Sequence, residues 1–198
     1  MKRPFILGLT GSIGMGKSAV AAMFHGIGVP VFDADAAVHA LQGPGGELLG
    51  LIEAEFPGTT GPTGVDRARL GGEVFGKADA LARLEAIVHP AVAAMRAEFL
   101  SRHAAAPLVV FDIPLLFEKG GTGQVDAVLV VSAPAEVQAA RVLARPGMSA
   151  EKFAQILALQ VPDAQKRARA DYVIDTGTSP GETRHAVQQL VDRLARQE

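Results

Sequence analysis

The segment Gly11–Ser18 constrains the fold of this chain more than any other, because it reads GSIGMGKS and matches the pattern G-x-x-x-x-G-K-[ST]. A short apolar run, Phe5–Leu9, precedes it, and apolar residues at helical spacing follow it, among them Val20 and Phe24. A glycine-rich turn between a buried strand and a helix is the context that a phosphate-binding loop requires. The segment therefore predicts a nucleotide-phosphate site at the end of the first strand, rather than a turn that matches by chance.

Each residue type of this loop has a task at a phosphate group. Glycines let the backbone curl so that successive N–H groups point at phosphate oxygens, and the helix that starts there adds the positive end of its dipole. Lys17 can reach the β- and γ-phosphates, and the hydroxyl of Ser18 can coordinate Mg²⁺. The predicted nucleotide-binding residues of the loop are Gly11, Ser12, Ile13, Gly14, Met15, Gly16, Lys17, Ser18 and Ala19.

Short apolar runs alternate with segments of helical spacing at both ends of the chain, which is typical of a parallel sheet covered by helices on both faces. The expected strands cover residues 5–9, 29–32, 108–111, 125–131 and 172–174, and a last helix covers 180–196. No strand signal is present over residues 36–106, where a helix over 47–56, a loop over 57–64 and helical periodicity over 66–103 are expected. The pattern predicts an α/β domain with a helical insertion.

Length and composition narrow the classes of protein to which this chain can belong. The 198 residues suffice for one domain, and a net charge of −2 does not favour a nucleic-acid partner. Cysteine is absent, which removes disulfides, thiolate metal sites and cysteine nucleophiles. Asp112 interrupts the most apolar stretch, residues 107–117, and the N-terminal apolar run is short, so neither a membrane span nor a signal peptide is predicted. A cytoplasmic protein is expected.

The absence of asparagine separates classes of nucleotide-binding protein. A guanine-specific GTPase normally carries the base-recognition motif N-K-x-D, which a chain without asparagine cannot supply. A motor or transporter ATPase is usually much larger than this chain. A small phosphotransferase, or a small ATPase with an unusual base site, remains.

Carboxylates stand at the predicted ends of two strands, where ligands bind in open parallel sheets. Asp112 closes an apolar run and can hold Mg²⁺ directly or through water, although an aspartate there can also simply cap the following turn. Asp33 follows the second strand and can accept the proton of an attacking hydroxyl group. Asp35, two residues further on, is expected to be the N-cap of the next helix.

Two arginines are candidates for neutralising charge on a transferred phosphoryl group. Arg141 and Arg145 lie four residues apart, so they are expected on one face of the helix that ends before Pro146. Guanidinium groups can spread charge across a phosphoryl transition state, but a solvated basic face is an open alternative. His89 is expected to be a structural hydrogen-bonding residue or a cap, and the other histidines show no metal-ligand spacing.

The chain resembles the dephospho-coenzyme A kinases in an ordered series of motifs spread over nearly its whole length. The most characteristic stretch is Asp112–Glu118, with the sequence DIPLLFE. The other matching residues are 9–14 with 16–18, 33–35 with His39, 66–67 with Leu70 and 74–75, 87–90, 138–145, Gln160 and 166–175. Pro146 and Thr176 depart from the family pattern, in which an acidic residue and an asparagine are more usual.

The resemblance implies a nucleoside-monophosphate-kinase-like fold with a five-stranded parallel sheet. Its core is expected at approximately 1–35, 105–135 and 170–198, the helical substrate-binding insertion at 36–104 and a lid at 136–169. The implied reaction uses ATP and Mg²⁺ and transfers the γ-phosphoryl group to the 3′-hydroxyl of the dephospho-CoA ribose. No nucleic acid or membrane is expected as a partner, and the protein is expected to be a monomer or a weak homo-oligomer.

By the same resemblance, Asp33 is the expected base, and Lys17 and Arg141 complete the catalytic set. Arg141 belongs to the ATP-binding side of the lid, and Arg145 is expected to bind the nucleotide as well. The substrate is expected to contact five residues, Asp33, His89, Leu115, Leu116 and Phe117. Two alternatives stay open: a nucleoside or nucleoside-monophosphate kinase, which shares the fold and the loop, and an ATP-binding regulatory switch.

Overall fold

The computed structural model describes residues 3–195, which divide into two compact units. The first unit comprises Met1–Phe32 and His103–Glu198, of which residues 3–32 and 103–195 are described. The second unit is Asp33–Arg102. The finer division into core, insertion and lid, with residues 136–169 acting as a lid, stays a prediction.

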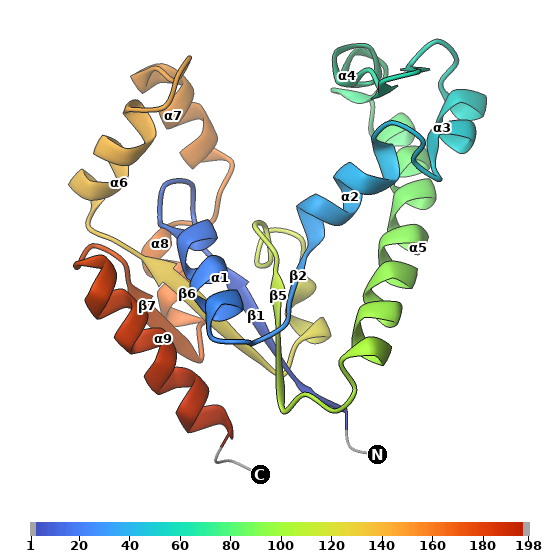
Figure 1. Ribbon diagram of the computed structural model, residues 1–198. Helices are drawn as coiled ribbons and strands as arrows, with labels where there is room; N and C mark the ends of the chain where they lie inside the picture. The colour runs from blue at the N-terminus through green and yellow to red at the C-terminus, as the bar shows by residue number, and fades with distance from the viewer. Residues whose placement is uncertain (1–2, 196–198) are drawn as a thin grey trace. The chain divides into compact units, whose positions relative to one another are not determined.

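The first unit is built on a five-stranded sheet with the strand order β2-β5-β1-β6-β7 (Figure 1). Its strands are β1 (Phe5–Thr10), β2 (Val31–Asp33), β5 (Leu108–Asp112), β6 (Ala127–Ser132) and β7 (Tyr172–Asp175). β1 pairs in parallel with β5 on one side and β6 on the other, and β6 pairs in parallel with β7. The predicted α/β fold with a five-stranded parallel sheet is confirmed.

Successive side chains of a strand point to opposite faces of its sheet, and in the central strands of this sheet both sets are apolar. Helices cover the sheet for this reason. The helices of the first unit are α1 (Lys17–Gly26), a 3₁₀ turn η1 (Gly121–Gln124), α6 (Ala135–Leu143), α7 (Ala150–Ala158), α8 (Asp163–Ala168) and α9 (Pro180–Ala195). Leu7 of β1 packs in one core cluster with Phe24 of α1 and Val187 of α9. Val128 of β6 belongs to a second cluster, which contains Leu116. Within residues 3–195, no helix has the length and apolar character needed to cross a membrane.

The second unit is a small helical body with its own apolar core. Its elements are α2 (Ala34–Gln42), α3 (Leu49–Glu55), β3 (Thr60–Gly61), β4 (Gly64–Val65), α4 (Arg67–Val74) and α5 (Ala78–Arg102). Its buried cluster takes Leu41 from α2, Ile52 from α3 and Leu70 from α4, with Val88 of α5 packed against it. The predicted helical character of this stretch is therefore confirmed, apart from the short hairpin between α3 and α4.

The prediction that residues 36–106 contain no strand is wrong. Thr60 pairs with Val65 and Gly61 with Gly64 in a two-residue antiparallel hairpin, which lies partly in the expected loop. Glu53 of α3 stabilises it, since its carboxylate accepts hydrogen bonds from the N–H of Gly58 at 2.7 Å and from the N–H and hydroxyl of Thr60. These bonds, the one from Gly58 first, hold the pKa of Glu53 below its usual range. Strands of two residues are too short to leave a visible alternation in the sequence.

The helical periodicity over 66–103 belongs to two helices rather than one. Asp66 caps α4 by accepting hydrogen bonds from the N–H groups of Ala68 and Arg69, both at 3.0 Å. Gly76 separates α4 from α5 with a φ of 73°, a left-handed conformation that glycine adopts without strain and that ends helices. The helix α5 then continues through Pro90, which has no N–H to donate and yet does not end it.

A buried ion pair joins α8 to the segment that follows β5. The Lys166 ammonium lies 2.8 Å from Oε1 of Glu118, and the Lys166 side chain has no exposed surface. Burial alone raises the pKa of the Glu118 carboxyl, but the Lys166 ammonium and the N–H of Val161 outweigh it, so this pKa lies below its usual range. The Glu118 carboxyl is therefore ionised at neutral pH.

Replacing Glu118 with alanine is expected to destabilise the protein by about 3–5 kcal/mol, because the Lys166 charge is then left buried without its partner. Urea unfolding at neutral pH measures this loss. The matched control is Glu98→Ala on α5, where Glu98 and Arg102 are exposed and 3.7 Å apart, and a loss of no more than about 0.5 kcal/mol is expected there. A loss below about 1 kcal/mol for Glu118→Ala would contradict the assigned role.

The contribution of this ion pair also depends on pH. A carboxyl whose folded-state pKa lies below its ordinary value of 4.5 stabilises the fold above that value. As the pH falls below 4.5 toward the lowered folded-state pKa, this stabilisation is lost. The difference in unfolding free energy between the wild type and Glu118→Ala is therefore expected to shrink on acidification.

Candidate nucleotide-binding site

The phosphate loop lies where the sequence predicts it, between the end of β1 at Thr10 and the start of α1 at Lys17. Gly14 and Gly16 have φ values of 77° and 84°, a left-handed conformation that other residues rarely adopt. Both glycines are also closely approached. A Cβ on Gly14 would lie 2.5 Å from Cγ2 of Val142, and one on Gly16 would lie 3.0 Å from the hydroxyl oxygen of Thr176. The glycines of the motif are thus required by this backbone.

Replacing Gly14 with alanine is expected to weaken the binding of MgATP at least about tenfold, because left-handed strain and the overlap with Val142 must displace the loop. Titration calorimetry with MgATP measures the effect. Gly26→Ala at the end of α1 is the matched control, since an added Cβ there meets no atom within 4 Å. Equal MgATP affinity in the Gly14→Ala variant and the wild type would show that this loop conformation is not needed.

The loop lysine is held by the carboxylate that ends β5. Nζ of Lys17 lies 2.5 Å from Oδ1 of Asp112, and the Asp112 side chain is only 5% exposed. The sheet register explains this contact, because Asp112 pairs with Leu9, two residues before the loop begins. The structure therefore brings together two residues that the sequence singled out from separate motifs.

The residues at the start of α1 and the end of β5 fit a magnesium ion that is bound chiefly through phosphates. Mg²⁺ takes only one or two protein oxygens at such sites and fills its other positions with phosphate oxygens and water. Asp112 offers a carboxylate, and Ser18, the second residue of α1, is an exposed hydroxyl. Within the described part of the chain, no group of three or more His, Cys, Asp or Glu side chains could hold a metal ion by itself.

Arg141 of α6 is fixed by Thr176, one of the two residues that depart from the family pattern. One guanidinium nitrogen donates to the carbonyl oxygen of Thr176 at 2.6 Å and another to its hydroxyl oxygen at 3.1 Å. That hydroxyl in turn donates to the carbonyl oxygen of Met15 at 2.8 Å. Thr176 thus links α6, the end of β7 and the phosphate loop, a role that the sequence did not reveal.

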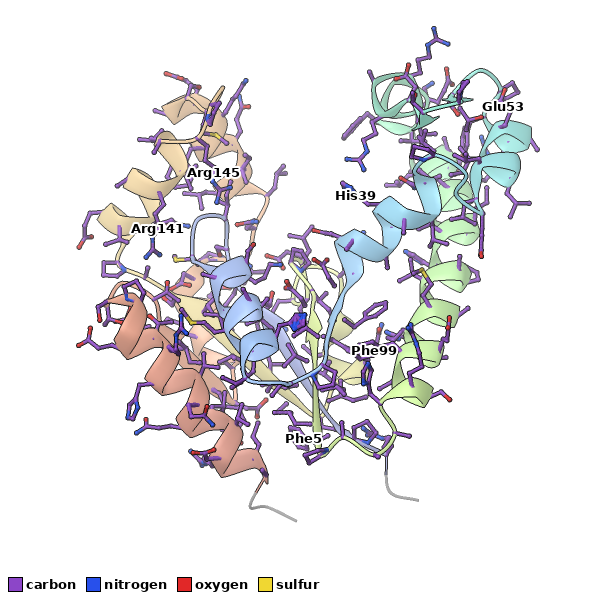
Figure 2. All side chains as sticks on the ribbon, viewed as in Figure 1. Phe5, His39, Glu53, Phe99, Arg141 and Arg145 are labelled. Carbon is purple, nitrogen blue, oxygen red and sulfur yellow. The ribbon has the colours of Figure 1, made fainter. Side chains whose placement is uncertain are left out.

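Arg145 does not share a helix face with Arg141, so that prediction is wrong. The helix α6 ends at Leu143, and Arg145 lies in the turn that follows, with its N–H donating to the carbonyl oxygen of Val142. Figure 2 labels both arginines in this part of the first unit. The assignment of Arg145 to nucleotide binding stays a prediction.

Asp33, rather than Asp35, is the N-cap of α2. The backbone at Asp33 is still extended, and its Oδ1 accepts a hydrogen bond from the N–H of Ala36 at 2.9 Å. Asp35 instead lies in the first helical turn, so the prediction that it is the cap is wrong by two residues. Asp33 is also the last residue of β2, and its side chain is exposed.

The residues expected to contact the substrate differ in exposure. His89 is exposed in the middle of α5, and Leu115 is 36% exposed. Leu116 and Phe117, by contrast, are buried in the second core cluster of the first unit. Packing already accounts for the apolar character of these two, and a role for any of the four in substrate binding stays a prediction.

Two glutamines hold the loop at Ile13. Nε2 of Gln138 in α6 donates to the carbonyl oxygen of Ile13 at 2.7 Å, and the N–H of Ile13 donates to Oε1 of Gln160 at 3.1 Å. Both glutamines fall in segments that carry the family resemblance, but their contacts with the loop could not be read from the sequence. Their partners are backbone atoms more than a hundred residues away, which leave no signal in residue type or spacing.

A phosphate loop between β1 and α1, with its lysine paired to the carboxylate that ends a neighbouring parallel strand, defines a P-loop nucleotide-binding protein of the α/β class. The family model of dephospho-CoA kinase matches residues 5–181. The chain belongs to the dephospho-CoA kinase family.

Its relatives match over nearly its whole length. A dephospho-CoA kinase from Novosphingobium aromaticivorans is 72% identical over 96% of this chain and 95% of its own. One from Mesorhizobium japonicum is 57% identical, with 96% of each chain covered. The solved structure of TT1252 from Thermus thermophilus is 38% identical, with a TM-score of 0.85 over 98% of this chain and 99% of that one.

Proposed function

We propose that this chain transfers the γ-phosphoryl group of ATP to the 3′-hydroxyl group of the dephospho-CoA ribose, which gives CoA and ADP in the last step of CoA biosynthesis. The observation that carries the proposal is the Lys17–Asp112 pair at the phosphate loop, in a chain of this family. In this pair, an ammonium group that can bind phosphates contacts a carboxylate that can bind a metal ion. A cytoplasmic location stays a prediction.

In the proposed reaction, the loop N–H groups and Lys17 bind the β- and γ-phosphates and orient them for in-line transfer. The carboxylate of Asp112 and the hydroxyl of Ser18 would hold Mg²⁺, which when bound neutralises charge on the phosphate oxygens. When phosphates arrive, Lys17 exchanges its contact with Asp112 for contacts with them. Positioning and charge neutralisation supply most of the acceleration.

Asp33 is the proposed base, which receives the proton of the attacking ribose hydroxyl. Two observations support this role: Asp33 ends a strand of the parallel sheet, and its cap on α2 uses Oδ1 alone. Arg141 is proposed to stabilise charge on the transferred group from the nucleotide side. His89, Leu115, Leu116 and Phe117 are proposed to contact dephospho-CoA, the first two through the surface that they expose.

An acceptor comparison tests the proposed function. ADP release from MgATP is measured with dephospho-CoA and, separately, with a panel of nucleosides and nucleoside monophosphates. Turnover with dephospho-CoA alone is expected. Turnover with a nucleoside monophosphate instead would keep the phosphate chemistry but overturn the proposed acceptor. ADP release that none of the acceptors stimulates would favour an ATP-dependent regulatory switch.

A further inference from the structure

The two peptide planes on either side of Ile13 are each fixed by one glutamine. The carbonyl of Ile13 belongs to the plane shared with Gly14 and accepts from Gln138, whereas the N–H of Ile13 belongs to the plane shared with Ser12 and donates to Gln160. Because a trans peptide is flat, holding the Ile13 carbonyl toward Gln138 directs the N–H of Gly14 the opposite way, away from that side chain. Gln138 therefore sets the direction of the Gly14 N–H, one of the loop N–H groups that the motif can use for phosphates, while Gln160 holds the Ile13 N–H itself.

The segment that carries Gln160 is anchored to the core of the same unit. Gln160 lies between α7 and α8, and the N–H of the next residue, Val161, donates to Oε1 of Glu118 at 2.9 Å. The same carboxylate oxygen is paired with the fully buried Lys166 of α8. The Val161 side chain packs against the cluster that contains Leu116. The hydrogen bond and the packing of Val161 therefore fix the backbone next to Gln160, and the Gln160 side chain reaches the loop from there.

Burial also favours Gln138 as a loop support rather than as a surface polar residue. Gln138 is 6% exposed although it lies on a short helix whose other residues are mostly exposed. Its amide nitrogen donates to the loop across 125 residues of sequence, and the Gln160 contact spans 147. A buried amide that makes a long-range bond to a glycine-rich turn restrains a backbone that would otherwise be among the freest in the chain.

We infer that Gln138 and Gln160 are positioning residues for phosphoryl transfer, which hold the Ile13 peptides so that the loop keeps its phosphate-binding conformation. The inference rests on the proposed function, because it concerns the same loop. Neither residue needs to touch the nucleotide. Gln160 acts through a hydrogen-bond acceptor and Gln138 through a donor, and this difference makes the roles separable by substitution.

Direct titration of MgATP, with melting temperatures and separate KM values as further readouts, tests the inference. Gln160→Met keeps the length of the side chain and removes the acceptor, so the Kd of MgATP is expected to rise about tenfold. Gln160→Glu keeps an acceptor oxygen, so its Kd is expected to stay within about threefold of the wild type. Gln138→Glu loses the donor and is expected to weaken binding as much as Gln160→Met. Gln138→Glu and Gln160→Glu add the same charge, so a difference between their MgATP affinities cannot come from charge alone.

A positioning role predicts that the KM for dephospho-CoA and the melting temperature of Gln160→Met match those of the wild type while the Kd of MgATP rises. MgATP affinity within twofold of the wild type in Gln160→Met would overturn the inference. Equal losses in Gln160→Met and Gln160→Glu, or a melting temperature that falls with both KM values, would overturn it too. Lys17→Met is the control that separates the positioning role of the glutamines from the proposed nucleotide site. Unchanged MgATP binding in Lys17→Met would overturn the proposed site itself.

Discussion

Lys17→Met is expected to lower kcat/KM for phosphoryl transfer by at least about a thousandfold. Lys17 supplies the ammonium group of the phosphate loop, which lies 2.5 Å from Asp112 and, in the proposed reaction, moves onto the γ-phosphate. Loss of one preorganised donor at a developing charge already costs about 10²–10³ in rate, and here a full positive charge is lost as well. Steady-state kinetics with MgATP and dephospho-CoA measure the effect.

The control for this variant is Lys77→Met. Lys77 is an exposed lysine between α4 and α5, and its ammonium group lies 3.4 Å from the Glu73 carboxylate. Its replacement is expected to leave kcat/KM unchanged. If Lys17→Met retained more than about a tenth of wild-type kcat/KM while remaining folded, Lys17 would not be the phosphate-binding lysine of the mechanism.

Asp33→Asn is expected to lower kcat by about 10²–10⁴, the range that a positioned general base contributes. The structure makes asparagine the informative replacement. Asp33 caps α2 through Oδ1, and asparagine is an equally good N-cap, so the helix keeps its start while the proton acceptor is lost. Alanine would mix the loss of the base with a loss of about 1 kcal/mol of helix stability. The KM for MgATP and the melting temperature are expected to match those of the wild type.

Asp35→Asn supplies the matched comparison, because Asp35 is an exposed carboxylate in the first turn of the same helix. It carries the same charge change two residues away and is expected to leave kcat within about twofold of the wild type. Turnover by Asp33→Asn close to that of Asp35→Asn would remove Asp33 from the mechanism. The pair of variants therefore separates base catalysis from a general effect of charge.

The central site was predictable because its residues follow from local patterns. The phosphate loop has a fixed sequence, and Asp112 stands at the end of a fully apolar strand, so strand order alone brings it beside the loop. The cap on α2 was misassigned because the helix starts at Ala34, directly after the last strand residue Asp33, with no connecting residue between the strand and the helix. Boundaries of this kind depend on where backbone hydrogen bonds stop, which residue types report only loosely.

The supports of the site were not predictable in the same way. Thr176, Gln138 and Gln160 are uncharged polar residues, and the backbone atoms that they bond lie in the loop, far away in sequence. No periodicity or charge pattern marks such contacts. Only the tertiary fold shows that Thr176 bonds both Arg141 and Met15.

The most direct test of the account is the position of the new phosphate in the product. Dephospho-CoA is incubated with MgATP and the enzyme, and the product is examined by mass spectrometry and by phosphorus NMR. We expect one added phosphoryl group, attached to the 3′-oxygen of the ribose, with one ADP formed for each product and far less of both formed by Lys17→Met. A phosphoryl group at another position, or ADP formed with inorganic phosphate and unchanged dephospho-CoA, would contradict the account.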